Sequence, residues 1–360
     1  MLFFIEKQYI INIRKRFRRG VTYMVSMKDI AKKCGVSVAT VSKALNGYSD
    51  IGAQRRAEIC KMADEMGYFP NSSARALKTK RTYNLGILFS DKARSGLTHD
   101  YFASIMESFK VTAEAKGYDI TFTNCNLNSR RMSYYEHCRY RGLDGVVVAC
   151  IDFYTPEVQE LILSSLPVVT IDHVFDSCIS VVSDNVKGMR DLLTYIYEQG
   201  HRKIAYIHGM ASSTTKARLG SFYRTLDDLG VKVPEAYVRE AEYRDTVMTE
   251  ICTEQLLDLP DPPTCILFPD DFSALGGINA IRARGLKIPD DISIAGYDGI
   301  TISRVIDPKM TTIHQDTLTI GKRAAEELIS LIERPKITLV EKIVVEGKLV
   351  EGESVKKLNG

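Results

Sequence analysis

The sequence predicts a small all-α domain at the N-terminal end, followed by a larger α/β body built as two lobes. Three observations predict this fold class. The chain has 360 residues, enough for two or three domains. Apolar residues recur at helical spacing up to about Gly67. From Tyr83 onward short apolar runs alternate with helical stretches, and this pattern restarts after Val182, which is typical of parallel sheets.

Charge is distributed unevenly along the chain, although the net charge is only +3. Residues 1–23 carry six Lys or Arg and one Glu, and residues 24–82 carry eleven Lys or Arg and five Asp or Glu. The remainder is therefore acidic. A basic front end indicates a polyanionic partner such as nucleic acid.

Composition also excludes several classes of protein. No apolar run approaches the roughly 20 residues that span a bilayer. The eight cysteines contain no CxxC pair, which argues against a zinc site and a disulfide framework. We therefore expect a protein of the reducing cytoplasm, with no membrane partner, no metal and no cofactor.

The stretch MKDIAKKCGVSVATVSKALN, starting at Met27, predicts two short helices around a tight turn. Gly35 can adopt the left-handed conformation that ends the first helix, and Ser37 suits the N-cap of the second. This pattern is a helix-turn-helix, and its alternative is an ordinary helical hairpin with a solvated polar face. The second helix leaves small or hydrogen-bonding side chains outward, suited to base edges in a major groove: Ala39, Thr40, Ser42, Lys43 and Asn46.

A third amphipathic helix follows and ends at Gly67. Its apolar face contains Ile59, Met62, Ala63 and Met66. The stretch GYFPNSSARALKTKR then leads into the body.

In the body, buried strands are predicted in YNLGILFS, YDITFTN, DGVVVAC and PVVTID, and again in KIAYIHG, CILFPD and ISIAGYD. The two halves predict two Rossmann-like lobes with a cleft between them. Ligands of such sheets bind beyond the carboxyl ends of the strands. Candidate ligand-binding side chains in those places are Tyr101, Phe102, Asp172, Arg218, Asp270, Asp271 and Asp298.

Carboxylates, an arginine and aromatic rings together suit a sugar, because they meet its hydroxyl groups and cover its apolar face. A sugar phosphate or a carboxylate remains an alternative through Arg218. Each acid could instead be a helix N-cap or a surface charge. The sequence has no GxxxxGK[ST], no GxGxxG after a strand, no HExxH and no GxSxG, so we do not expect an enzyme.

The chain resembles the lactose-repressor (LacI/GalR) family of bacterial transcription regulators. In the head the resemblance rests on DIAKKCGVSVATVSKALN and GYFPNSSARAL. In the body it rests on GHRKIAYIHG, ARLGSF, PDDFSALGG and IPDDISIAGYDG. The resemblance implies a periplasmic-binding-protein-like effector domain, a homodimer, double-stranded operator DNA as partner, and a small-molecule effector, here expected to be a sugar. A sugar-binding protein, a sugar-active enzyme, and a regulator that responds to a sugar phosphate or a purine are the alternatives.

The resemblance also assigns roles in the head. Val38 and Ala39 stand where family members read operator bases, and Thr40 and Ser42 stand where phosphate or base contacts fall. Lys43 stands where many members carry Arg, whose planar fork a lysine lacks. In the following segment Asn71 would cap a hinge helix running to Lys78. Leu77 matches the leucine that wedges into the minor groove.

In the body, the resemblance makes Arg218 the residue that grips the effector and Asp298 an acidic effector contact. Asp270 stands where Asn is common. Tyr243, in AEYRD, stands where several members place a stacking aromatic ring.

The expected domain boundaries follow from these patterns. They are a non-family extension over 1–23, the helix-turn-helix domain over 24–70, the hinge over 71–82, and the effector-binding and dimerisation domain over 83–360. Lobe one would comprise about 83–181 and 312–333, and lobe two about 182–311 and 334–360. For residues 1–23 two hypotheses stand: translation starts at Met24 or Met27, or the segment is a basic arm that contacts phosphates.

Overall fold

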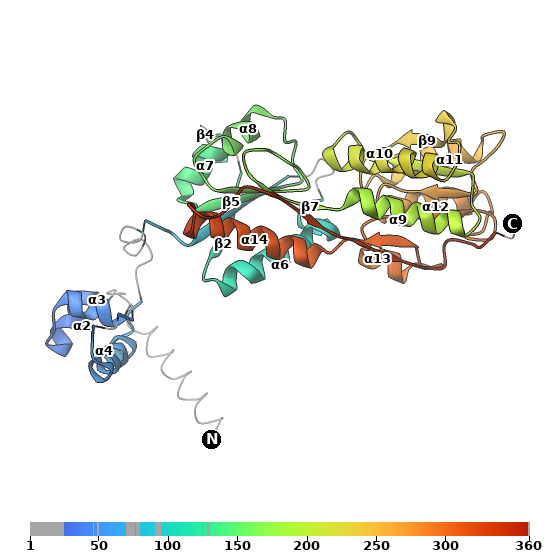
Figure 1. Cartoon of the computed structure of the whole chain (residues 1–360). Coiled ribbons are helices and arrows are strands. Elements are labelled where there is room, and N and C mark those ends of the chain that lie inside the picture. The colour runs from blue at the N-terminus through green and yellow to red at the C-terminus, as the bar shows by residue number, and fades with distance from the viewer. Residues whose placement is uncertain are drawn as a thin grey trace, which may run out of the picture. The chain divides into compact units, whose positions relative to one another are not determined.

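The computed structural model describes residues 25–45, 47–48, 50–69, 76, 80–90, 95–124, 126–127 and 130–358. The chain divides into two compact units, Met1–Lys80 and Arg81–Gly360, which we call the head and the body (Figure 1). The predictions for residues 1–23, Asn46, Asn71 and Leu77 lie outside the described residues. Among the residues described, no helix is long and apolar enough to cross a membrane.

The head consists of three short helices around one apolar core. They are α2 (Met27–Cys34), α3 (Val38–Leu45) and α4 (Ala53–Met66). Ile30, Val41 and Ile59, one from each helix, are fully buried against one another. Residues spaced three and four apart along each helix thus form the single core that the sequence pattern predicts.

The turns of the head follow the predicted chemistry. Gly35 ends α2 in the left-handed conformation, with φ 63°. The hydroxyl of Ser37 accepts a hydrogen bond from the backbone N–H of Thr40 at 3.0 Å, which caps α3. Gly67 ends α4 with φ 69°. These features confirm the predicted helix-turn-helix.

Lobe one of the body is built on a six-stranded parallel sheet in the order β13-β7-β6-β5-β1-β2. The strands are β1 (Asn84–Phe89), β2 (Asp119–Phe122), β5 (Gly145–Ala149), β6 (Val168–Ile171), β7 (Ile179–Ser183) and β13 (Lys342–Val345). Helices α6 (Asp100–Ala115) and α14 (Thr317–Glu333) cover one face, and α7 (Tyr134–Arg141) and α8 (Pro156–Ile162) cover the other. Alternate residues of the strands supply the cores on the two faces.

Lobe two is built on a four-stranded parallel sheet in the order β11-β10-β8-β9. Its strands are β8 (Ile204–His208), β9 (Val238–Glu240), β10 (Cys265–Leu267) and β11 (Ser293–Ala295). Helices α9 (Asn185–Glu198) and α10 (Ser213–Asp228) cover one face, and α11 (Thr246–Leu257) and α12 (Ala274–Ala283) cover the other. The remaining elements are α13 (Thr301–Val305), the 3-10 turns η1 (Gly96–Thr98) and η2 (Glu235–Tyr237), and the short pair β3 (Asn126–Leu127) and β4 (Arg130–Arg131).

Two short strands correct the predicted lobe boundaries. Strand β12 (Thr312–His314) pairs antiparallel with β14 (Lys348–Val350) and bridges Asp298, so it belongs to lobe two. Strand β13 instead pairs with β7 and belongs to lobe one. The predicted placement of 312–314 in lobe one and of 342–345 in lobe two is wrong, because a short apolar run does not reveal which sheet it joins. The chain still crosses between the lobes three times, after β7, after β12 and after β13.

Helix α10 places Arg218 within its second turn. The helix starts at Ser213, where the hydroxyl of Ser212 caps it by accepting from the N–H of Thr215 at 3.0 Å. Arg218 is 3% exposed.

Candidate functional site

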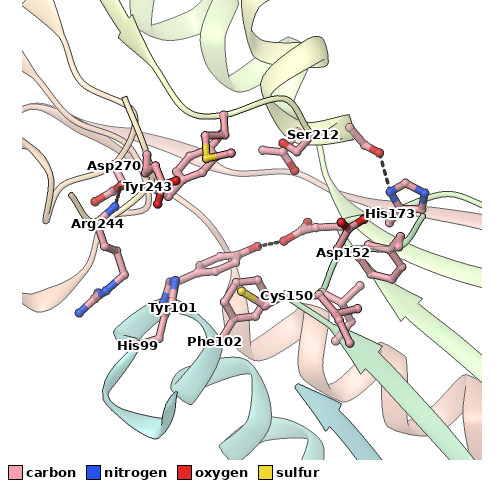
Figure 2. A pocket seen from close by; sticks show the side chains of 18 of the residues that line it. His99, Tyr101, Phe102, Cys150, Asp152, His173, Ser212, Tyr243, Arg244 and Asp270 are labelled. Carbon is pink, nitrogen blue, oxygen red and sulfur yellow. Dashed lines mark hydrogen bonds between the residues drawn. The ribbon is translucent and has the colours of Figure 1, made fainter. Parts of the chain in front are cut away.

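A cavity of about 460 Å³ lies between the lobes, on the side where the parallel strands end. The side chains of seven predicted ligand-binding residues line it: Tyr101, Phe102, Asp172, Arg218, Tyr243, Asp270 and Asp298. Asp271 does not line it. Figure 2 shows Tyr101 and Phe102 entering from one side and Tyr243 and Asp270 facing them from another. Segments far apart in sequence thus meet at one pocket, as expected for strands with shared carboxyl ends.

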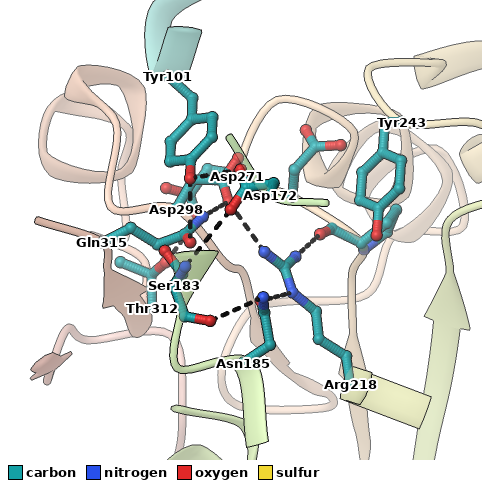
Figure 3. A network of polar contacts seen from close by, with 12 residues as sticks. Tyr101, Asp172, Ser183, Asn185, Arg218, Tyr243, Asp271, Asp298, Thr312 and Gln315 are labelled. Atoms are coloured by element: carbon teal, nitrogen blue, oxygen red, sulfur yellow. Dashed lines mark hydrogen bonds and ion pairs between the residues drawn. The ribbon is translucent and has the colours of Figure 1, made fainter. Parts of the chain in front are cut away.

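Arg218 is held at the bottom of the pocket by contacts on several sides (Figure 3). Its Nε donates to Oδ1 of Asn185 at 2.7 Å, and Nη1 donates to the carbonyl of Pro269 at 3.0 Å. Its Nη2 lies 3.6 Å from Oδ1 of Asp298, and the guanidinium stacks over the ring of Tyr297 at 3.6 Å. The arginine is therefore oriented before any ligand arrives, and its charge is opposed by a buried carboxylate.

Asp298 and Asp172 are joined to Arg218 through a network that spans both lobes (Figure 3). Nε2 of Gln315 donates to Oδ1 of Asp298 at 2.6 Å. The hydroxyl of Tyr101 donates to Oδ2 of Asp172 at 2.8 Å and lies 3.4 Å from Oε1 of Gln315. Gln315 stands at one of the three crossings, so the network links the pocket to a connection between the lobes.

Three buried carboxyls at or beside this site, those of Asp298, Asp172 and Asp271, have raised pKa values. Burial raises the pKa of Asp298 to about 7, although the nearby Arg218 opposes the shift. Burial also raises the pKa of Asp172, and the hydrogen bond from Tyr101 lowers it in part. Burial holds the pKa of Asp271 well above its ordinary range. Among the residues described, no group of three or more His, Cys, Asp and Glu could hold a metal ion.

Asp270 and Asp271 both serve the fold. Oδ1 of Asp270 accepts from the N–H of Ser273, and Oδ2 accepts from the hydroxyl of Ser273 and the N–H of Arg244 at 2.9 Å. Asp271 accepts from Thr312 at 2.6 Å and from the N–H of Ile300 at 2.9 Å. Both oxygens of each carboxylate are engaged, so only the lining position of Asp270 supports the predicted contact with a ligand.

Two contacts cross the pocket from lobe to lobe. Nη1 of Arg244, in lobe two, lies 3.3 Å from Oδ2 of Asp100 in lobe one. Nδ1 of His173, in lobe one, is 2.7 Å from the hydroxyl of Ser213 in lobe two (Figure 2). His173 also stacks on Phe153 at 4.3 Å between ring centroids. These contacts hold the lobes together on two sides of the pocket.

Backbone strain is concentrated at the same pocket. Four lining residues other than glycine have positive φ: Cys150 at 51°, Asp172 at 58°, Arg244 at 62° and Asp298 at 103°. Such conformations cost about 1–3 kcal/mol each and persist where the surroundings impose them. Their gathering in one cavity is independent support for a functional site.

Sequence reasoning did not find several lining residues, among them Arg244, His173, Gln315 and Cys150. Cys150 directly follows β5, and His173 is the second residue after β6, so the rule applied to other strand ends would have found them. Gln315 was missed because its strand was placed in the wrong lobe. No sequence signal marks Arg244, whose position depends on how the lobes meet.

The side chains predicted to read DNA lie along α3 of the head. Val38, Ala39 and Lys43 are exposed, and Thr40 and Ser42 are half-buried. The hydroxyl of Thr40 is 2.8 Å from that of Ser37, and Nζ of Lys43 pairs with Oδ2 of Asp50. The helix thus presents small side chains at its start and one lysine further along, and Lys43 must leave Asp50 to reach a base or a phosphate.

Comparison with known proteins decides the family. Residues 26–71 match the family described as bacterial regulatory proteins, lacI family, and residues 193–355 match a periplasmic binding protein-like domain. Over 341 residues the chain is 31% identical to the HTH-type transcriptional repressor PurR of Pasteurella multocida (strain Pm70), covering 92% of this chain and 99% of that protein. This chain belongs to the lacI family. It is a DNA-binding transcriptional repressor with a ligand-binding domain, and not an enzyme.

Other lacI-family proteins extend the comparison. The "Probable HTH-type transcriptional repressor ExuR" of Bacillus subtilis (strain 168) is 28% identical over 338 residues, covering 93% of this chain and 99% of that protein. The crystal structure of the lac repressor dimer bound to operator and the anti-inducer ONPF matches with a TM-score of 0.77 at 23% identity. The match covers 92% of this chain and 99% of the lac repressor chain. The likeness shows that the two proteins share a fold.

Proposed function

We propose that this lacI-family repressor is a cytoplasmic homodimer that controls carbohydrate-utilisation genes, and that a neutral sugar in the interlobe pocket changes its affinity for the operator. The observation that carries the effector class is the charge of the pocket. Five acidic residues line it, Asp152, Asp172, Glu242, Asp270 and Asp298, against two arginines. Both arginines already face carboxylates, Arg218 facing Asp298 and Arg244 facing Asp100.

This charge balance disfavours an anionic effector. A phosphate or carboxylate ligand would enter beside the buried oxygens of Asp172 and Asp298, and each arginine already faces a carboxyl group. A neutral ligand with many hydroxyl groups meets no such penalty. Its O–H groups donate to the carboxylates, and its oxygens accept from the guanidinium.

The aromatic residues of the pocket fit the same ligand. Phe102 and Tyr101 meet edge to face, with ring centroids 4.9 Å apart. Tyr243 is fixed by its hydroxyl, which is 2.9 Å from that of Thr215. A sugar ring has one polar edge and one apolar face, so a cavity with carboxylates on one side and aromatic rings beside them is suited to it.

The three crossings between the lobes can couple effector binding to DNA binding. Effector binding would shift the balance between open and closed arrangements of the lobes, and with it the dimer and the hinge segment next to the head. The coupling is reciprocal, so operator DNA must change effector affinity by the same factor. Two heads of a dimer would read a nearly palindromic operator.

A thermal-shift screen of the full chain against neutral sugars, sugar phosphates and purines tests the effector class. Binding raises the melting temperature by mass action. We expect a neutral sugar to stabilise the protein and to change its affinity for operator DNA. Stabilisation by phosphorylated sugars or purines alone would overturn the sugar proposal and leave the repressor intact, and turnover of a sugar would contradict a purely binding role.

Selection of duplexes from a randomised library tests the proposed reading residues. We expect an enriched, nearly palindromic sequence, and Lys43→Ala should change the preference at one position of each half-site. Leu77→Ala should weaken binding to the selected duplex far more than to a scrambled one, because a wedge acts at one base step. Equal weakening of both would argue against the wedge.

A further inference from the structure

The body begins with three consecutive residues that contact the ends of helices α14 and α7 and the start of strand β2. Nη2 of Arg81 donates to the carbonyl of Ile332 at 3.1 Å, at the end of α14. The hydroxyl of Thr82 donates to the carbonyl of Gly142 at 2.6 Å, directly after α7. The carbonyl of Tyr83 accepts from the N–H of Asp119 at 2.8 Å, where β2 begins four residues after the end of α6. The ends of α14 and α7, and the turn that follows α6, therefore lie at the point where the chain enters the body.

Exposed cations gather at those helix ends. They are Lys116 after α6, Arg139 and Arg141 in the last turn of α7, and Arg334 and Lys336 after α14. We call these five residues the linker collar. None of them forms an ion pair with a residue that the structure describes. Arg141 lies over the ring of Tyr140 at 5.8 Å, and Tyr140 is 60% exposed.

The acidic side chains nearby are engaged elsewhere, with the exposed Asp119 as the exception. Asp144 accepts from the backbone N–H groups of Thr82 and Tyr83 at 2.9 and 2.8 Å. Glu333 lies 3.9 Å from Arg81, and Glu114 lies 3.7 Å from Lys110. The linker collar is thus a basic surface in an otherwise acidic body, and it surrounds the point to which the DNA-reading head is tethered.

We propose that the linker collar contacts the phosphate backbone of the DNA that flanks the operator. Cations also stabilise helix C-termini through the helix dipole, and that role requires no DNA. The dipole does not explain why five exposed cations gather around a tether to a DNA-binding head and face no carboxylate of the described residues within ion-pair distance. The planar guanidinium of arginine matches phosphate with two parallel hydrogen bonds, which suits Arg139 and Arg141 to this contact. The proposal rests on DNA binding by the head and adds a second contact surface to it.

The salt dependence of binding tests this proposal with the full chain and a duplex recovered by selection. Each phosphate contact adds about 0.9 to the slope of log affinity against log salt concentration. We expect Arg139→Gln combined with Arg141→Gln to lower that slope by up to about 1.8 per protomer without altering the selected sequence. The matched control is Lys216→Gln combined with Arg224→Gln, two exposed cations on α10 of lobe two, which should leave the slope unchanged.

Shortening the flanks of the duplex provides a test that needs no variant. The wild-type slope should fall as the flanks are removed, and the slope of the Arg139/Arg141 variant should fall less. An unchanged slope in both experiments overturns the proposal, because the collar then serves only the helix dipoles. Failure of the selection to enrich any duplex would instead contradict the reading residues assigned to the head.

Discussion

Arg244 and Asp100 form an ion pair between the two lobes, with Nη1 and Oδ2 3.3 Å apart, beside the pocket. The arginine is well fixed for this contact. Its guanidinium stacks over Phe272 at 4.1 Å, and its backbone N–H donates to Asp270. Asp100 is half exposed, so solvent screens the pair.

Loss of this pair should loosen the closed arrangement of the lobes. For Arg244→Gln we expect effector to bind about 1.4- to fivefold more weakly, since a screened pair contributes about 0.2–1 kcal/mol. Most of the change should be in the dissociation rate. Stopped-flow measurements at low and high salt check this, with Arg284→Gln, which breaks the pair with Asp258 inside lobe two, as control. Equal dissociation rates in the wild type and Arg244→Gln would show that the pair does not hold the pocket closed.

Removal of Arg218 should damage both stability and effector response. Arg218→Ala leaves the buried carboxylate of Asp298 and the amide of Asn185 without their partner, and breaking such a pair costs about 3–5 kcal/mol. Denaturant unfolding of the body measures the loss. Arg218→Lys keeps the charge but loses the fork of donors, so it should recover part of the stability and little of the response. A full effector response in Arg218→Ala would mean that the pocket is wrongly assigned.

Asp298 should make stability fall as pH rises. Its pKa in the folded protein is about 7, above the ordinary value of 3.8, so between these values the folded state holds a proton that the unfolded state has released. The free energy of unfolding should therefore decrease through that window, by up to about 1.4 kcal/mol per pH unit. Asp298→Asn removes this contribution.

Melting temperatures of the wild type and Asp298→Asn, measured from pH 4 to pH 8, check the sign. The melting temperature of the variant should rise relative to that of the wild type as pH increases. The difference between the two melting temperatures should level off above about pH 7. Parallel curves for the two proteins would refute the raised pKa. Asp298→Asn also removes a charge that raises the pKa of the neighbouring Asp271, and this change favours the variant in the same direction as pH rises.

Gly276 allows two helices of lobe two to pack closely. A Cβ atom at this position would lie 1.8 Å from the backbone carbonyl oxygen of Thr246, at the start of α11. Gly276→Ala should therefore destabilise the body by about 1–3 kcal/mol or more, because backbone cannot rotate away as a side chain can. The control is Gly220→Ala within α10, where no atom lies within 4 Å. The Gly220→Ala substitution should increase the free energy of unfolding of the body by about 0.5–1 kcal/mol. Similar unfolding midpoints for the two variants would contradict this account.

The features that were predicted correctly from the sequence are those that depend on local chemistry. Gly35, Ser37 and Gly67 confirm predictions because caps and turns depend on neighbours within a few residues. Asp172 and Asp298 were found from the rule that parallel strands end on the same side of a sheet. Their roles as effector contacts, and those of the other site residues, stay predictions.

The features of the fold and the site that were not predicted depend on long-range packing, which no local sequence pattern reveals. Strands β12 and β13 contain three and four residues, and their pairing partners lie about 36 residues along the chain for β12 and 162 residues for β13. The ion pair of Arg244 depends on how the lobes meet. The two oxygens of Asp270 are occupied by Ser273 and Arg244, which the motif PDDFSALGG does not show.

The three crossings mean that neither lobe is encoded by one continuous segment. Lobe one lacks its edge strand until β13 has been made, and lobe two lacks β14 and Ser354, whose hydroxyl is bonded to Thr311 and Ile294 within its core. During synthesis on the ribosome, both lobes therefore wait for the same residues, 342–354, while the helices of the head can already close around their own core. A nascent chain would thus expose a DNA-reading head before it possesses an effector pocket, so the ability to bind DNA would precede the ability to be regulated.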